Sequence, residues 1–203
     1  MKKQTLKLPV FPLNGAILFP GANLPLNVFE ERYLEMVDYA MSSDRKIGMI
    51  QEIEKTKKLY EIGCIGKITN FSETKDNRYI INLEGISHFK KIKEIETQKI
   101  FRILLVEYDD NSIFNIGKHK FNKDVLFDKF KLFLEKQYNE NNFSGIEKIE
   151  SNELIKFIAM ASPFNVPEKQ MLLESKNISD LEEKLIGLFD FYNNQYQEKN
   201  TIN

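Results

Sequence analysis

The segment that most resembles a phosphate-binding site is Gly63 to Ile68, which contains two glycines and a lysine. A P-loop needs four residues between its glycines, so that successive backbone amides surround the phosphates, and a Ser or Thr directly after the lysine. Here two residues separate Gly63 from Gly66, and Ile68 follows Lys67. The segment therefore predicts glycines that pack tightly within a strand, and not a nucleotide site.

The side chains that could act as nucleophiles or metal ligands are few and far apart. Cys64 is the single cysteine, and His88 and His119 are the two histidines. A metal site needs three or four convergent ligands, so no metal is expected. Cys64 lies among isoleucines in a predicted strand, which favours an inert buried thiol. Ser87 precedes His88, but a catalytic pair meets in space and needs a third group that orients the histidine. We therefore expect no catalytic residue, no metal and no cofactor.

The charged residues balance almost completely, with 29 basic and 30 acidic residues and a formal net charge of −1. The most basic stretches, residues 89–93 and 118–120, have acidic neighbours that include Glu94 and Asp109. Nucleic-acid backbones usually require a basic excess on one surface. These stretches therefore predict solvated faces, and nucleic acid is not an expected partner.

The N-terminal half has the pattern of short β-segments separated by turn residues. Residues 79–83 alternate as a strand with one buried face does, after a predicted hairpin turn at 74–77. One amphipathic helix interrupts this region at 30–41. The other predicted strands lie at 46–51, 59–71 and 101–106.

From about residue 122 the apolar spacing becomes helical, after a predicted cap at Asn122. A second helix follows Ser151, with Phe157 among its inward residues, and a third begins near Pro167. The last helix is predicted to open with a capping box at Ser179 to Glu182. The fold class expected is α+β, a β-rich part at 1–110 and a helical bundle at 111–203, with the boundary at 110–121.

Neither a signal peptide nor a membrane span is expected. No apolar run of signal-peptide length precedes Pro9 and Pro12, and no stretch approaches the ~18 apolar residues that a membrane span needs. The sequence predicts a cytoplasmic protein without a membrane partner.

A dense set of prolines and aromatics opens the chain, and it resembles a known family. Residues 8–13 (LPVFPL) and 18–33 (LFPGANLPLNVFEERY) are similar to the opening pattern of the Lon N-terminal domain family. Further segments resemble that family in the same order along the chain. They are residues 47–50 (IGMI), 60–68 (YEIGCIGKI), 79–89 (YIINLEGISHF) and 168–174 (EKQMLLE). Two positions depart from the pattern: Glu31 replaces a common proline, and His88 replaces the usual arginine.

This resemblance implies a β-rich, PUA-like pseudo-barrel with one helix, followed by a helical bundle. It also implies a proteolysis-associated (peptidase S16-related) domain that recognises protein substrates, here without ATPase and protease domains. The function expected is therefore a non-catalytic polypeptide-binding module and not an enzyme. Its partner would be an unfolded or partly folded polypeptide, or one specific protein. The alternatives are an RNA-binding PUA-like module and a regulator that docks on one folded partner.

The candidate binding residues are Phe29, Glu30, Arg32 and Tyr33, between the proline-rich entry and the first helix. A polypeptide-binding module offers exposed apolar and aromatic side chains ringed by charge. A purely structural role is the alternative, in which Phe29 and Tyr33 fasten the helix to the barrel and Arg32 pairs with Glu30 or Glu35.

Overall fold

The computed structural model describes residues 3–109, 122–138, 140 and 142–201, and the predicted boundary at 110–121 lies outside them. The chain forms two compact units. One comprises Met1–Ile116 and Phe164–Glu174, and the other comprises Gly117–Pro163 and Ser175–Asn203. The predicted division placed every residue after 110 in the helical part, whereas here residues 164–174 belong with the strands.

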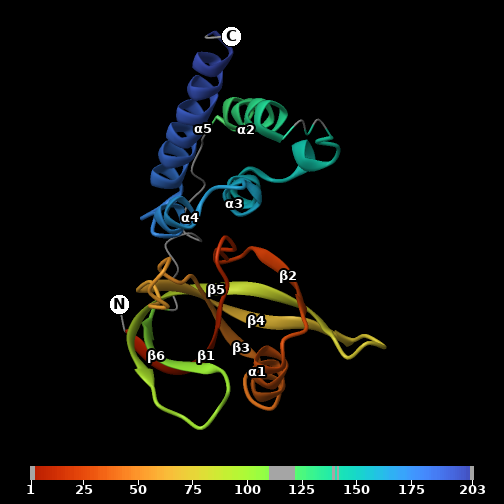
Figure 1. The fold of residues 1–203 in the computed structure, drawn as a ribbon, viewed down its shortest axis with the longest axis vertical. Coiled ribbons are helices and arrows are strands. Elements are labelled where there is room, and N and C mark those ends of the chain that lie inside the picture. Colours follow the sequence, from red (N-terminus) through yellow and green to blue (C-terminus); the bar gives the residue numbers. More distant parts are fainter. Residues whose placement is uncertain (1–2, 110–121, 139, 141, 202–203) are drawn as a thin grey trace. The chain divides into compact units, whose positions relative to one another are not determined.

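The first unit is built on one six-stranded sheet, ordered β2-β5-β4-β3-β1-β6, in which β5 and β6 also pair (Figure 1). The extra pairing closes five of the strands into a barrel, with β2 as an additional strand beside β5. With helices accompanying this sheet, the predicted α+β fold is confirmed. The strands are β1 (Gln4–Pro12), β2 (Asn23–Val28), β3 (Lys46–Ile50), β4 (Ile62–Glu73), β5 (Tyr79–Ile95) and β6 (Arg102–Tyr108).

Strand β5 is long enough to pair with two other strands along the same edge. Its residues 79–84 pair with β2, and its residues 89–95 pair with β6. Gly85 lies between these two sections. Its N–H donates to the Ala22 carbonyl and its carbonyl accepts from the Gly21 N–H, both at 2.8 Å. A glycine is required here because an added Cβ would lie 2.1 Å from the Phe19 carbonyl oxygen.

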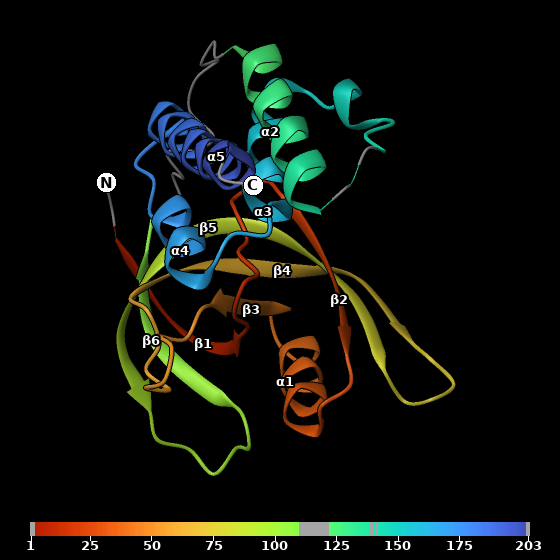
Figure 2. The ribbon, with the colours of Figure 1, turned by 45° about the horizontal axis from the view of Figure 1, so that its top comes forward.

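The interior of the barrel is filled by apolar side chains from most of its strands. One buried cluster consists of Leu8, Val10, Ile50, Leu59, Ile65, Phe89, Leu104 and Val106. Beyond the barrel, the ends of β4 and β5 continue as a projecting hairpin (Figures 1 and 2). Its turn lies where predicted, with Asn77 at a φ of 59° and the Thr74 N–H bonded to the Arg78 carbonyl at 2.9 Å.

The helix α1 (Glu31–Met41) has the amphipathic pattern that the sequence predicts. Its buried residues are Tyr33, Met36, Val37 and Ala40. The Tyr33 ring packs against Phe11 of β1, with 4.2 Å between the ring centroids. This contact holds the start of α1 against the barrel.

The short helix α4 (Val166–Leu173) belongs to the first unit through a buried amide network. The Gln51 Nε2 donates to the Val166 carbonyl at 3.2 Å and to Gln170 Oε1 at 3.1 Å. Gln170 Nε2 in turn donates to the Ile62 carbonyl at 3.1 Å. Since buried amides are costly unless they are hydrogen-bonded, these two glutamines fix α4 against β3 and β4.

The second unit is helical, as predicted. It contains α2 (Lys123–Tyr138), the short 3-10 helix η2 (Ile146–Lys148), α3 (Ser151–Ala161) and α5 (Ile178–Thr201). The Asn122 cap is confirmed, because its side chain accepts from the Val125 N–H at 3.2 Å. Helices α2 and α5 join through aromatic rings, with Phe133 and Phe189 at 5.4 Å between centroids. Among the described residues, no helix is both long and apolar enough to cross a membrane.

Two local predictions in this unit were wrong. Phe157 of α3 was expected to face inward but is exposed. The last helix begins before the predicted capping box, because Asn177 acts as its cap and accepts from the Asp180 N–H at 2.9 Å. An asparagine satisfies a free N–H at a helix start as well as a serine does, so the local sequence offered two competing caps.

Candidate functional site

The predicted binding residues lie where β2 ends and α1 begins. Phe29 and Glu30 connect these elements, and Glu30 keeps an extended backbone as the residue before the helix. The Glu30 carbonyl accepts the first helical hydrogen bond, from the Leu34 N–H at 3.0 Å. Its side chain does not cap the helix and is therefore available for another contact.

Glu30 uses that carboxylate to hold Arg32. Glu30 Oε2 accepts from Arg32 Nε at 3.0 Å and from Arg32 Nη2 at 2.7 Å. The hydrogen bond to Glu30 raises the pKa of Arg32 above its ordinary value. The guanidinium also lies 4.6 Å from the centre of the Tyr33 ring, a stacking that an arginine favours. Arg32 is therefore held in place by residues on both sides of it.

The structure separates the four predicted residues into two groups. Tyr33 is only 7% exposed and belongs to the core, which is the structural role considered above. Phe29 is 63% exposed and does not fasten the helix to the barrel. Glu30 and Arg32 are also on the surface and pair with each other. Of the two aromatic candidates, Phe29 alone is available for contact with a partner.

Two residues that the sequence analysis did not select complete this surface. The Arg78 guanidinium lies 5.6 Å from the centre of the Phe29 ring. Ile80 is 39% exposed and pairs with Asn27, two residues before Phe29. Residues 78 and 80 alternate with the buried face of β5, so an apolar Ile80 on the outward face was a signal for this surface. We call Phe29, Arg78 and Ile80 the Phe29 face.

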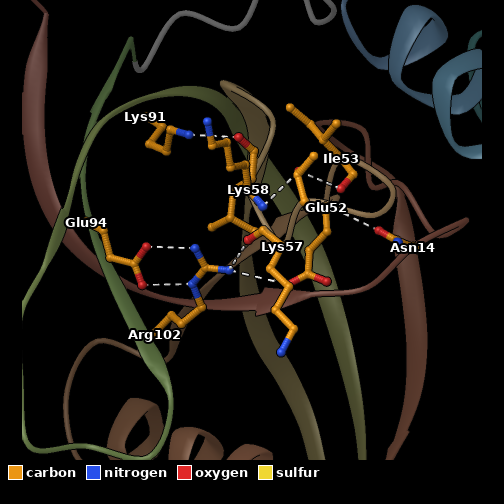
Figure 3. Close-up of polar contacts among 10 residues, drawn as sticks. Asn14, Glu52, Ile53, Lys57, Lys58, Lys91, Glu94 and Arg102 are labelled. Atoms are coloured by element: carbon orange, nitrogen blue, oxygen red, sulfur yellow. Dashed lines mark hydrogen bonds and ion pairs between the residues drawn. The ribbon is translucent and has the colours of Figure 1, made fainter.

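A second polar cluster surrounds Arg102, at the start of β6 (Figure 3). Arg102 donates to both carboxylate oxygens of Glu94, from Nε at 2.8 Å and from Nη2 at 2.7 Å. Its Nη1 donates to Glu52 at 3.3 Å and to the Lys57 carbonyl at 3.2 Å. The Glu52 N–H donates to Asn14 Oδ1 at 2.7 Å. Arg102 thus ties the loop after β3 to strands β5 and β6.

This cluster adjoins a pocket of about 540 Å³, which lies within the first unit. Lys58, Lys91, Glu61, Glu94 and Arg102 line part of it. Two of the basic groups have partners, since Lys91 Nζ donates to the Leu59 carbonyl at 2.7 Å and Arg102 donates to Glu94 and Glu52. Among the described residues, no group of three or more His, Cys, Asp or Glu side chains could hold a metal ion.

The Glu94→Gln substitution should show how strongly this cluster holds the loop. Because the hydrogen bond from Arg102 lowers the pKa of Glu94, the carboxylate is the form that Arg102 stabilises. Removing its charge should lower the free energy of unfolding by about 1 kcal/mol at pH 7. Urea denaturation would measure the change.

The matched control for Glu94→Gln is Glu61→Gln. Glu61 pairs with Lys90 at a longer distance of 3.6 Å, and both side chains are largely exposed, so we expect no measurable change there. Equal effects of the two substitutions would contradict a specific role for the Arg102 pair.

Most of the chain matches the model of a known protein family. The model described as the ATP-dependent protease La (LON) substrate-binding domain matches residues 7–190. Among curated relatives, a Lon protease from Buchnera aphidicola is 25% identical over 93% of this chain. One from Dictyoglomus thermophilum is 25% identical over 88% of it. The chain spans about a quarter of the length of these relatives, 25% and 23% respectively.

Solved structures show the same fold. A Lon N-terminal domain protein from Xanthomonas campestris superposes with a TM-score of 0.60 at 19% identity, over 89% of this chain and 98% of that one. The N-terminal domain of a Lon protease from the Mycobacterium avium complex gives a TM-score of 0.61 at 16% identity, over 91% and 98%.

Proposed function

The chain belongs to the ATP-dependent protease La (LON) substrate-binding domain family, and from this premise we propose that it is a non-catalytic module that binds unfolded polypeptide. The observation that carries the proposal is the exposure of Phe29, a large aromatic side chain that is 63% accessible on the surface of the first unit. We propose the Phe29 face as the place where the polypeptide binds.

The chemistry of the Phe29 face suits an apolar segment of polypeptide. Aromatic residues and arginine are enriched among the side chains that contribute most to binding between proteins. Phe29 and Ile80 offer apolar area, and Arg78 adds a cation above the ring. Arg78 is itself balanced by Asp76 at 2.8 Å, so the face has no strong net charge. A neutral apolar surface favours apolar segments over nucleic-acid phosphates.

Glu30, Arg32 and Tyr33 have positioning roles in this proposal. Tyr33 anchors the first turn of α1 to the barrel, and Glu30 holds Arg32 over the Tyr33 ring. Because Phe29 is the residue immediately before Glu30, this packing holds the backbone from which the Phe29 side chain projects. Less ordering is then needed when a partner binds, which favours affinity.

The test is the affinity of a labelled, permanently unfolded polypeptide, measured by fluorescence anisotropy. Phe29→Ala should weaken binding about tenfold, the effect of removing one aromatic contact residue. The matched control is Phe191→Ala in α5, where a phenylalanine of similar exposure, 54%, lies in the second unit. It should leave the affinity unchanged.

Three outcomes of these measurements would count against the proposal. If the wild-type protein shows no saturable binding at tens of micromolar, the polypeptide-binding function is wrong. If Phe29→Ala and Phe191→Ala behave alike, the Phe29 face is not the binding surface. If RNA binds instead, with an affinity that falls steeply as salt rises, the RNA-binding alternative is favoured.

A further inference from the structure

Strand β2 has one open edge. Within the described residues it pairs only with β5, and no backbone hydrogen bond joins its other edge to the chain. Hydrogen-bonded and non-hydrogen-bonded pairs alternate along an antiparallel ladder. The bond from the Gly85 N–H to the Ala22 carbonyl sets this alternation. Counting from Ala22, the backbone groups of Asn23, Pro25 and Asn27 point to the open edge, where Pro25 has no N–H to offer.

This edge carries one proline and lacks the charged side chains that commonly protect an edge strand against pairing with another strand. Natural edge strands are commonly blocked by charged side chains, by proline or by a bulge. All six residues of β2 are uncharged, so no charge blocks its edge. Pro25 provides the one proline and removes one outward donor. Asn27 keeps its outward N–H and carbonyl, and its side chain is exposed.

The open edge leads directly to the exposed aromatic ring. Residues 23, 25 and 27 of β2 alternate with residues 24, 26 and 28, whose side chains are more buried. Phe29 continues the exposed series one position beyond the strand, with its ring at the surface. A strand added beside β2 would therefore place its own outward side chains next to Asn27 and Phe29.

We propose that the open edge of β2 takes up an extended, apolar segment of polypeptide as an additional strand. This inference rests on the proposed function and specifies how the polypeptide is held. Alternating N–H and C=O groups at strand spacing match another peptide backbone, whereas β2 offers no cation for a phosphate. Its neutral edge favours an apolar segment over a charged one.

Two substitutions on the edge should change the affinity in opposite directions. Asn27→Pro removes an outward N–H but keeps the bonds to β5, and an extended Leu26 tolerates a following proline. It should weaken binding about fivefold relative to Asn27→Ala, which loses the same side chain but keeps the N–H. Pro25→Ala supplies an additional outward N–H and should tighten binding about threefold. Fluorescence anisotropy with the same labelled polypeptide measures all three.

A second measurement leaves the protein unchanged. Short apolar peptides derived from the bound polypeptide would be N-methylated at every second amide, in the two possible registers. Strand addition predicts that one register loses about tenfold or more in affinity while the other binds nearly as the parent does. This comparison holds even if Asn27→Pro disturbs folding.

The outcomes separate this inference from the function on which it rests. If the unfolded polypeptide does not bind the wild-type protein, the proposed function fails. If it binds and Phe29→Ala weakens it, but neither Asn27→Pro nor N-methylation has any effect, only the edge inference is overturned. If Asn27→Pro instead turns a dimer into a monomer in sedimentation without changing peptide affinity, a second copy of the chain covers the edge and the inference is wrong.

Discussion

Replacing Gly85 with alanine should lower the free energy of unfolding of the first unit by about 3 kcal/mol. The added Cβ would lie 2.1 Å from the Phe19 carbonyl oxygen and 2.8 Å from its carbon. Both are backbone atoms, so no side chain can rotate away. Relief requires the segment 19–22 to move away from β5, which breaks the two hydrogen bonds that Gly85 makes with Gly21 and Ala22.

The matched control is Gly187→Ala in α5. A Cβ at Gly187 would have no heavy atom within 4 Å, and alanine is the better helix former by about 1 kcal/mol. This variant should therefore be slightly more stable than the wild type.

Urea denaturation, with hydrogen exchange to follow the strand amides separately from the helical ones, would measure both glycine variants. A Gly85→Ala protein with unchanged exchange in β2 and β5 would contradict the close approach at Phe19.

Lowering the pH from 6.5 to 4 should reduce the contribution of His88 to the free energy of unfolding by about 3 kcal/mol. Burial lowers the pKa of His88 from 6.5 to about 4, and its Nε2 atom is not reached by solvent. Between these values the unfolded chain binds a proton that the folded chain does not. The unfolded state is therefore favoured progressively as the pH falls, and above about pH 7.5, where the histidine is neutral in both states, the contribution of this group is constant.

Urea midpoints at half-unit intervals from about pH 7.5 to about pH 4 would test this pH dependence, with His88→Gln as the non-titrating comparison. The difference between the two proteins isolates His88, because the carboxylates with lowered pKa values, Asp76, Glu94 and Asp180, are present in both. Parallel profiles over this range would show that His88 titrates normally in the folded protein.

Both predictions depend on the same part of the molecule, the central stretch of β5. His88 pairs with Cys64 across the ladder with β4, and its ring lies 6.0 Å from that of Phe19. Gly85 touches the backbone of the same Phe19. A change at either position should therefore affect how the segment 19–22 leads into β2 and the proposed binding edge.

The local elements of this protein could be read from short stretches of sequence. The amphipathic spacing of α1, the asparagine cap at Asn122 and the hairpin turn at Asn77 each depend on neighbouring residues. Helical periodicity and turn chemistry act over a few positions, so the sequence alone predicts them. The choice between Asn177 and Ser179 as a cap was missed because both residues satisfy the same local rule.

The candidate site was predicted only in its location. The junction of β2 and α1 follows from the motif at residues 18–33, but the burial of Tyr33 depends on its contact with Phe11. Phe29 remains exposed beside Arg78. Arg78 and Ile80 join the surface through the pairing of β2 with β5. Alternation along one strand shows which side chains share a face, but it does not show which other strand lies beside them.

Contacts between residues that are far apart in the sequence decided how these elements are assembled. Gln51 and Gln170 are 119 positions apart, yet their hydrogen bond brings α4 into the unit formed by the strands. Arg102 meets Glu52 across 50 positions, and β5 meets both β2 and β6 because it is long enough for two partners. The sequence by itself determined most of the helices and the turn at 74–77, since those depend on local spacing, whereas the face of Phe157 and the start of α5 differ from the prediction. Only the tertiary structure decided the closed barrel, the membership of α4 and the open edge of β2, since these depend on register between distant residues.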